Sequence, residues 1–196
     1  MNFLILDVGT SSMRGILFRG NGEMLHTVQK TYQVITLDHG WVEQNPLDFK
    51  DHMTAIVKES AAWAGEHGES IDAVAITSQR SSVIPVDENG NHLGNAQMWQ
   101  DKRTVPMCRA MEEHHREIFK LSGSRVNPVF SGAKMKWMRQ NQPDLYEKAY
   151  KLTVIPDYLV YHMTGEFATD WTYGSRSLLM NLKTCQWDDR LLELFE

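Results

Sequence analysis

The chain has 196 residues, of which 42% are hydrophobic and 10% aromatic, and its formal net charge is −5. These values are typical of one globular domain with a sizeable core, and the absence of a basic run argues against a nucleic-acid partner. The N-terminus has no basic segment and no long apolar segment, so we expect neither a signal peptide nor membrane association. The two cysteines lie far apart in no metal or redox spacing, which favours a cytoplasmic protein.

The first part of the chain predicts an antiparallel meander followed by a helix. Apolar runs at 3–6 and 16–18 flank a polar turn, and a third strand is expected over 24–34. Residues 38–44 are expected to form a loop. The segment 46–66 carries apolar residues at helical spacing behind an Asn-Pro start, which predicts an amphipathic helix.

The rest of the chain alternates strands with helices. The apolar run at 71–77 predicts a buried strand parallel to the first. Further strands are expected at 82–86 and 152–155, and a loop with one strand at 167–181. Helices are expected at 101–115, 117–121, 131–141, 156–163 and 189–195, with a short one from Pro143 and with Asp101, Ser131 and Asp188 as N-caps. This order predicts an α/β domain in which helices pack on a mixed sheet.

The first turn has the residues of a phosphate site. Asp7 lies at its entrance and Arg14 at its exit. Between them lie a glycine and three hydroxyl residues, namely Gly9, Thr10, Ser11 and Ser12. Consecutive N–H groups and hydroxyls can hold phosphate oxygens, and an aspartate beside them suits an intervening Mg²⁺ ion or its water. The alternative is an ordinary hairpin with a polar turn.

Two later segments suit a hydroxylated ligand. Arg80 directly follows the strand at 71–77, and ligand sites of α/β sheets lie beyond the carboxyl ends of strands. Trp99 could stack on the apolar face of a sugar while its polar neighbours hold hydroxyls. The alternative for Arg80 is a surface arginine at a turn. The alternative for Trp99 is a tryptophan in the core, followed by Asp101 as a helix N-cap.

Other conspicuous residues have structural explanations. Lys134 and Lys136 point in different directions on one helix, so a solvated helix face with a buried Trp137 is expected. Adjacent His114 and His115 project about 100° apart on a helix and do not form a zinc site. The 11 methionines are expected to fill the core.

Taken together, these segments resemble the N-terminal domain of the FGGY family of carbohydrate kinases, and within it the glycerol kinases and xylulokinases. The resemblance covers essentially the whole chain, and six blocks in family order carry it. The blocks are LDVGTSSMR (6–14), GWVEQNP (40–46), ITSQR (76–80), MWQDKR (98–103), FSGAKMKW (130–137) and the segment 170–176.

The resemblance implies a ribonuclease-H-like, actin-like ATPase fold and ATP-dependent phosphorylation of a small sugar or polyol. ATP would lie in a cleft between two similar domains, with Mg²⁺ organised by Asp7. The resemblance also implies that Gly9, Thr10, Ser11 and Ser12 form the phosphate loop and that Arg14 supplies a positive charge near it. The substrate positions that it implies are Arg80, Ser81, Trp99 and Asp101. The family resemblance leaves a homodimer open.

Two departures from the glycerol kinase pattern affect the substrate. Ser81 replaces an acidic polyol ligand, and Val129 replaces a tyrosine that contacts glycerol. A pocket that loses two hydrogen-bonding groups should discriminate against its former substrate by well over an order of magnitude. We therefore expect a larger or differently hydroxylated sugar or polyol rather than glycerol.

The catalytic base is expected outside residues 1–196. In this family the base is an aspartate near the junction with the C-terminal domain, and the chain ends before it. We therefore expect an incomplete N-terminal domain, without a C-terminal domain and inactive alone, because phosphoryl transfer depends on positioning in a complete cleft. The alternatives are a non-catalytic sensor of nucleotide or sugar, and a carbohydrate-binding module that uses the chain's 6 Trp residues.

Overall fold

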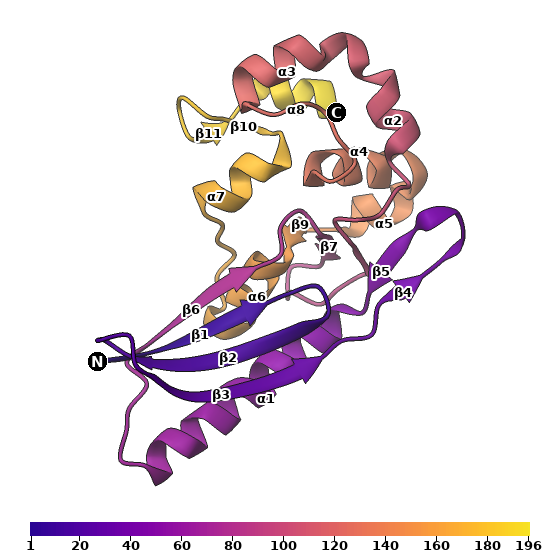
Figure 1. Cartoon of the computed structure of the whole chain (residues 1–196). Coiled ribbons are helices and arrows are strands. Elements are labelled where there is room, and N and C mark those ends of the chain that lie inside the picture. Colours follow the sequence, from indigo (N-terminus) through magenta and orange to yellow (C-terminus); the bar gives the residue numbers. More distant parts are fainter. The chain divides into compact units, whose positions relative to one another are not determined.

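The computed structural model describes residues 1–196 and divides into two compact units (Figure 1). Unit 1 comprises Met1–Val34 and Asn45–Gln79, and unit 2 comprises Ile35–Gln44 and Arg80–Glu196. Unit 1 has one sheet and one helix, whereas unit 2 has two sheets and the other helices. None of the helices combines the length and the apolarity needed to cross a bilayer.

Unit 1 is built on a four-stranded sheet with the order β3-β2-β1-β6. Its strands are β1 (Asn2–Val8), β2 (Ser12–Arg19), β3 (Met24–Thr31) and β6 (Ala73–Ser78). The first three form the predicted antiparallel meander, and β6 pairs in parallel with β1 as predicted. The expected burial of β6 is wrong: Val74 is 37% exposed, because β6 is an edge strand with a neighbour on one side only.

Helix α1 (Pro46–Glu66) has the predicted bounds and packs on β2 and β3. Its start is fixed by Asn45, whose side chain accepts a hydrogen bond from the Leu47 backbone N–H at 3.1 Å. The buried face of the helix comprises Pro46, Phe49, Met53, Ile56, Ser60 and Ala64. This face approaches the sheet closely at Gly15, where a Cβ would lie 2.2 Å from Ile56 Cγ2.

Unit 2 contains a five-stranded sheet with the order β4-β5-β8-β7-β9 and antiparallel pairing throughout. Its strands are β4 (Ile35–Thr36), β5 (Val42–Gln44), β8 (Ala96–Gln97), β7 (Val83–Val86) and β9 (Lys151–Val154). The predictions for β7 and β9 are confirmed. The loop expected over 38–44 is wrong in its second half, because β5 pairs with β4 on one side and with β8 on the other.

The helices of unit 2 are mostly those that the sequence predicts. They are α2 (Val105–Ala110), α3 (His115–Ser122), α4 (Ser131–Asn141), α5 (Pro143–Lys148), α6 (Ile155–Thr164), α7 (Trp171–Gly174) and α8 (Asp189–Phe195). Short 3-10 turns occur at Asp38–Gly40, Glu112–His114 and Ser175–Ser177, and a small hairpin joins β10 (Met180–Asn181) to β11 (Gln186–Trp187). Asp188 caps α8 as predicted by accepting a hydrogen bond from Leu191 N–H at 3.0 Å.

Two of these helix predictions and one loop prediction need correction. The helix expected from Asp101 begins only at Val105, because the Asp101 carboxylate binds elsewhere in unit 2. Ser131 is the first residue of α4 rather than its cap, and no side chain caps that helix. The segment expected to be loop with one strand contains α7 and the 3-10 turn after it, because the Asp170 carboxylate accepts hydrogen bonds from two backbone N–H groups of α7.

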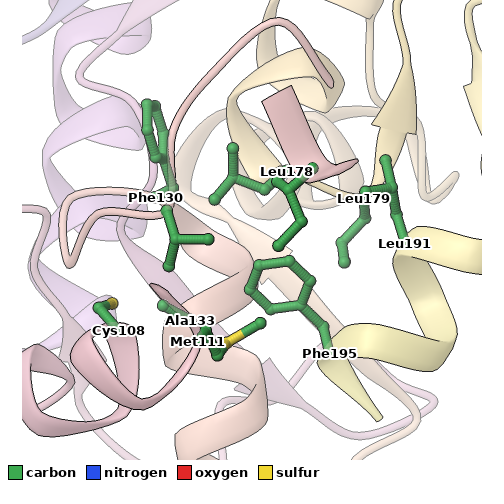
Figure 2. Close-up of a cluster of buried hydrophobic side chains, with 10 residues drawn as sticks. Cys108, Met111, Phe130, Ala133, Leu178, Leu179, Leu191 and Phe195 are labelled. Atoms are coloured by element: carbon green, nitrogen blue, oxygen red, sulfur yellow. The ribbon is translucent and has the colours of Figure 1, made fainter. Parts of the chain in front are cut away.

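The apolar core of the helical part of unit 2 gathers side chains from α2, α3, α4 and α8 with the segment before β10 (Figure 2). Its members are Cys108, Met111, Ile118, Val126, Phe130, Ala133, Leu178, Leu179, Leu191 and Phe195. Figure 2 shows the Phe195 ring inserted among these side chains, so the last helix of the chain is part of the core rather than an appendage.

Replacement of Gly15 by alanine should destabilise the protein. The new methyl group would lie where Ile56 Cγ2 now packs, and overfilling a packed interface costs about 1–3 kcal/mol of the free energy of unfolding. Gly65→Ala is the matched control. It lies in α1 with nothing within 4 Å of the added Cβ, so it should leave stability unchanged or raise it by up to about 1 kcal/mol. Urea unfolding of both variants measures the difference, and equal effects would contradict this packing.

Candidate functional site

The β1–β2 turn of unit 1 is held from inside by Gln79. The Gln79 side-chain amide donates a hydrogen bond to the Gly9 carbonyl at 3.1 Å, and its oxygen accepts one from Thr10 Oγ1 at 3.4 Å. Within the turn, Gly9 N–H donates to the Ser12 carbonyl at 2.9 Å. A Cβ on residue 9 would lie 3.2 Å from that same carbonyl oxygen, so glycine lets the turn close tightly.

The two serines of the turn differ in their surroundings. Ser11 is exposed, and its carbonyl accepts a hydrogen bond from Tyr32 N–H at 2.9 Å, which ties the turn to the end of β3. Ser12 belongs to β2, and its Oγ accepts a hydrogen bond from Gln29 Nε2 at 3.0 Å. The sequence did not indicate a role for Gln29 or Gln79, because Gln29 reaches the turn from β3 and Gln79 from the residue after β6.

Asp7 and Arg14 face each other across the β1–β2 pair. They are register partners, and the guanidinium donates to Asp7 Oδ2 at 3.0 Å. Arg14 therefore lies within β2 rather than at the exit of the turn. Both side chains remain partly open to solvent, at 38% for Asp7 and 49% for Arg14.

The donor set around Asp7 fits Mg²⁺ in the form that accompanies nucleotides. Mg²⁺ keeps several waters and binds to one or two carboxylates together with substrate phosphates, rather than to a complete protein cage. Asp7 offers one partly exposed carboxylate, of which only Oδ2 is paired with Arg14. No group of three or more His, Cys, Asp or Glu side chains converges to form a cage by itself.

In unit 2, Trp99 lies in an irregular loop rather than at the start of a helix. Its backbone N–H donates to Ser82 Oγ at 3.0 Å, which ties the loop to the strand β7 region. The Trp99 side chain is 37% exposed, so the core-anchor alternative does not describe it. A partly exposed ring on a fixed loop can stack on the apolar face of a sugar.

Asp101 lies inside unit 2 and has no exposed side-chain area. Its carboxylate accepts hydrogen bonds from Val42 N–H at 2.6 Å and from the backbone N–H, Nε and Nη2 of Arg103 at 2.8–2.9 Å. Both oxygens are thus occupied within the protein. This arrangement positions the loop that carries Trp99 and leaves no Asp101 oxygen facing solvent.

The partner of Asp101, the Arg103 guanidinium, is buried among carboxylates and aromatic rings. It also donates to Glu43 Oε1 at 2.7 Å. The guanidinium carbon lies 4.2 Å from the Trp41 ring centre and 5.0 Å from the Trp137 ring centre. Trp137, predicted to be buried, is half-buried and meets Trp41 edge to face at 5.5 Å. The sequence did not indicate a role for Arg103.

Arg80 and Ser81 begin a second group of polar residues in unit 2. Arg80 is exposed, whereas Ser81 is buried in a left-handed conformation with a φ of 71°. Ser81 Oγ donates to the Arg176 carbonyl at 3.4 Å, and the Arg176 guanidinium lies 4.4 Å from the Phe130 ring centre. Burial, with a contribution from the charge of Arg80, lowers the pKa of Arg176. The sequence did not assign a role to Arg176, although it lies in the last of the six blocks.

Lys134 is completely buried, which corrects the solvated helix face predicted for it. Its Nζ donates to the Pro128 carbonyl at 2.7 Å and to the Val129 carbonyl at 3.0 Å. Burial lowers the pKa of Lys134 to about 7, although the charge of Asp101 opposes the shift. A neutral amine has two N–H donors, which matches the two carbonyls, so Lys134 fixes the loop that carries Val129.

The stability contributed by Lys134 should depend on pH. Because its folded-state pKa of about 7 lies below the ordinary value of 10.5, the unfolded chain binds more protons between these values. The free energy of unfolding of the wild type, minus that of Lys134→Met, should therefore rise from pH 7 to pH 9, by up to about 1.4 kcal/mol per pH unit. Below about pH 7 the difference should level off. Urea unfolding across this range measures it, and a flat difference above pH 7 would contradict a buried neutral amine.

Comparison with known proteins identifies relatives along the whole chain. The model of the FGGY family of carbohydrate kinases, N-terminal domain, matches residues 2–196. A glycerol kinase of Leptothrix cholodnii is 36% identical over 100% of this chain and 41% of its own length. A glycerol kinase of Thermococcus gammatolerans is 35% identical over 98% of this chain and 40% of its own length. The chain thus spans about two fifths of the length of these relatives.

Solved structures of the same family have the same fold. Plasmodium falciparum glycerol kinase with ADP matches 98% of this chain and 40% of its own, with a TM-score of 0.93 and 27% identity. Gluconate kinase from Lactobacillus acidophilus matches 99% of this chain and 39% of its own, with a TM-score of 0.90 and 26% identity. These matches confirm the predicted ribonuclease-H-like, actin-like ATPase fold. The chain belongs to the FGGY family of carbohydrate kinases.

Proposed function

We propose that this chain is the N-terminal part of an ATP-dependent kinase that phosphorylates a hydroxyl of a small sugar or polyol. A C-terminal domain that carries the general base would complete it. The observation that supports this proposal best is the β1–β2 turn, where a partly exposed carboxylate stands beside hydroxyls held in place by Gln79. Such a turn suits phosphate oxygens and a metal ion on them.

The phosphate side of the reaction is assigned to unit 1. Asp7 would hold Mg²⁺ or its water, and Arg14 orients the carboxylate through their ion pair. When bound, Mg²⁺ supplies the positive charge that neutralises the transferred phosphoryl group. The turn of Gly9, Thr10, Ser11 and Ser12 would hold phosphate oxygens, with the Ser11 and Ser12 hydroxyls as donors, while the Gly9 N–H and the Thr10 hydroxyl fix the shape of the turn through Ser12 and Gln79.

The substrate side is assigned to residues of unit 2. The Arg80 guanidinium would donate hydrogen bonds to substrate hydroxyls, and the partly exposed Trp99 ring would cover the apolar face of the sugar. Ser81 is buried and its hydroxyl donates to the Arg176 carbonyl, so we assign it to fixing the backbone beside Arg80. Asp101 acts as a positioning residue for the Trp99 loop, since it is fully engaged with Val42 and Arg103.

The substrate is proposed to be larger than glycerol. Ser81 and Val129 stand where glycerol kinases have an acid and a phenol, and smaller side chains with fewer hydrogen-bonding groups leave room for a longer molecule. The related structures include proteins named glycerol, gluconate and xylulose kinases.

Two free cysteines fit a reducing cytoplasm, in which ATP and Mg²⁺ are available. We include a homodimer in the proposal as the assembly to test by sedimentation.

A substrate panel tests this function. The chain joined to its C-terminal domain should release ADP from Mg·ATP in the presence of a ketose, an aldonate or a pentitol. Its kcat/KM for glycerol should be lower by at least tenfold than that for its best substrate. The absence of turnover with every sugar, together with nucleotide binding, would favour the non-catalytic sensor. Glycerol as the best substrate would contradict the assignment of Ser81 and Val129.

Variants of the same protein test the assigned residues. Arg80→Met should lower kcat/KM for the best substrate by about 100-fold, mainly through KM, since it removes charged hydrogen bonds to hydroxyls. Asp7→Ala should lower kcat by at least 100-fold and raise the Mg²⁺ concentration needed for activity. Arg109→Gln, an exposed arginine on α2, is the control and should keep wild-type kinetics. Equal kinetics for all three variants would contradict the site.

A further inference from the structure

A cavity on unit 2 shares no residue with the β1–β2 turn or with the residues proposed to bind substrate. It has a volume of about 460 Å³, which lies within the range of sites for small molecules. It is formed around helix α3 by Glu112, His115, Arg116, Phe119 and Arg125. Figure 1 shows α3 at the periphery of its unit.

The cavity carries unpaired positive charge. Arg116 and Arg125 take part in none of the ion pairs of the chain, whereas Arg190 pairs with Glu117 on the same helix α3. The single carboxylate of Glu112 does not balance two guanidiniums. Guanidiniums bind phosphate oxygens through paired N–H donors, so an anion with several oxygens suits the arginine side of the cavity better than a neutral ligand does.

The remaining lining residues suit a hydroxylated carbon skeleton. The Phe119 ring is 51% exposed, and an aromatic face can cover the C–H face of a sugar. Glu112 offers carboxylate oxygens that accept hydrogen bonds from hydroxyls. An inorganic anion alone would use the arginines and leave both of these groups without a role.

We propose that this cavity binds a phosphate monoester of a sugar or polyol. The phosphate would lie between Arg116 and Arg125, and the hydroxylated carbon chain would lie against Phe119 and Glu112. The proposal is independent of the kinase function, because it concerns binding alone and involves none of the residues assigned to catalysis or substrate.

Calorimetric titration of the chain with D-glucose 6-phosphate, inorganic phosphate and D-glucose tests the proposal. We expect saturable binding of glucose 6-phosphate, at least tenfold weaker binding of inorganic phosphate and no saturable binding of glucose. Arg116→Gln combined with Arg125→Gln should weaken glucose 6-phosphate binding by at least tenfold. Phe119→Ala should weaken binding of the ester and leave that of inorganic phosphate unchanged.

Two controls keep the test specific. Arg109→Gln with Lys120→Gln removes the same net charge from α2 and α3 without touching the cavity, and should bind glucose 6-phosphate as the wild type does. Arg80→Met should also leave this binding unchanged, which separates the cavity from the proposed substrate site. Absence of saturable binding, or equal weakening by the control pair, would overturn the proposal. Binding of inorganic phosphate as tight as that of the ester would overturn the sugar assignment.

Discussion

The order of unit 2 depends on the contacts that the buried Arg103 guanidinium makes. Its side chain is 1% exposed and meets carboxylates from two segments, Asp101 in its own loop and Glu43 on β5. Its faces are covered by Trp41 and, on α4, by Trp137. Removal of one partner from such a buried group costs about 3–5 kcal/mol, because an uncompensated charge remains. One side chain therefore holds a loop, a strand and a helix in register.

This arrangement explains how unit 2 can present the proposed substrate-binding residues on irregular backbone. The Trp99 loop is fixed from inside by Asp101 and Arg103, and the Val129 loop is fixed from inside by the buried Lys134 amine. Both loops are thus held before a ligand arrives, so binding does not carry the full entropic cost of ordering them. In unit 1, Gln79 has the same role for the β1–β2 turn.

The sequence predicted those elements whose causes are local. Helix α1 has the predicted bounds because its Asn45 cap and its apolar spacing both lie within the segment itself. The interior cations could not be predicted, since lysine and arginine are normally solvent-exposed and only distant partners make their burial tolerable. For the same reason the sequence predicts Asp101 as a helix cap, whereas its carboxylate accepts hydrogen bonds from the Val42 N–H and the Arg103 guanidinium. The β1–β2 turn itself was predicted, but the side chains of Gln29 and Gln79 that hold it were not.

Hydrogen exchange of Arg103→Met under native conditions tests most directly whether Arg103 orders unit 2. We expect the backbone amides of residues 42 and 103, which donate to Asp101 in the wild type, to exchange at least tenfold faster in the variant, while amides of β1, β2 and β3 keep their rates. Arg109→Met, at an exposed position on α2, should change neither set. Unchanged protection at residues 42 and 103, or equal acceleration in both units, would contradict the account.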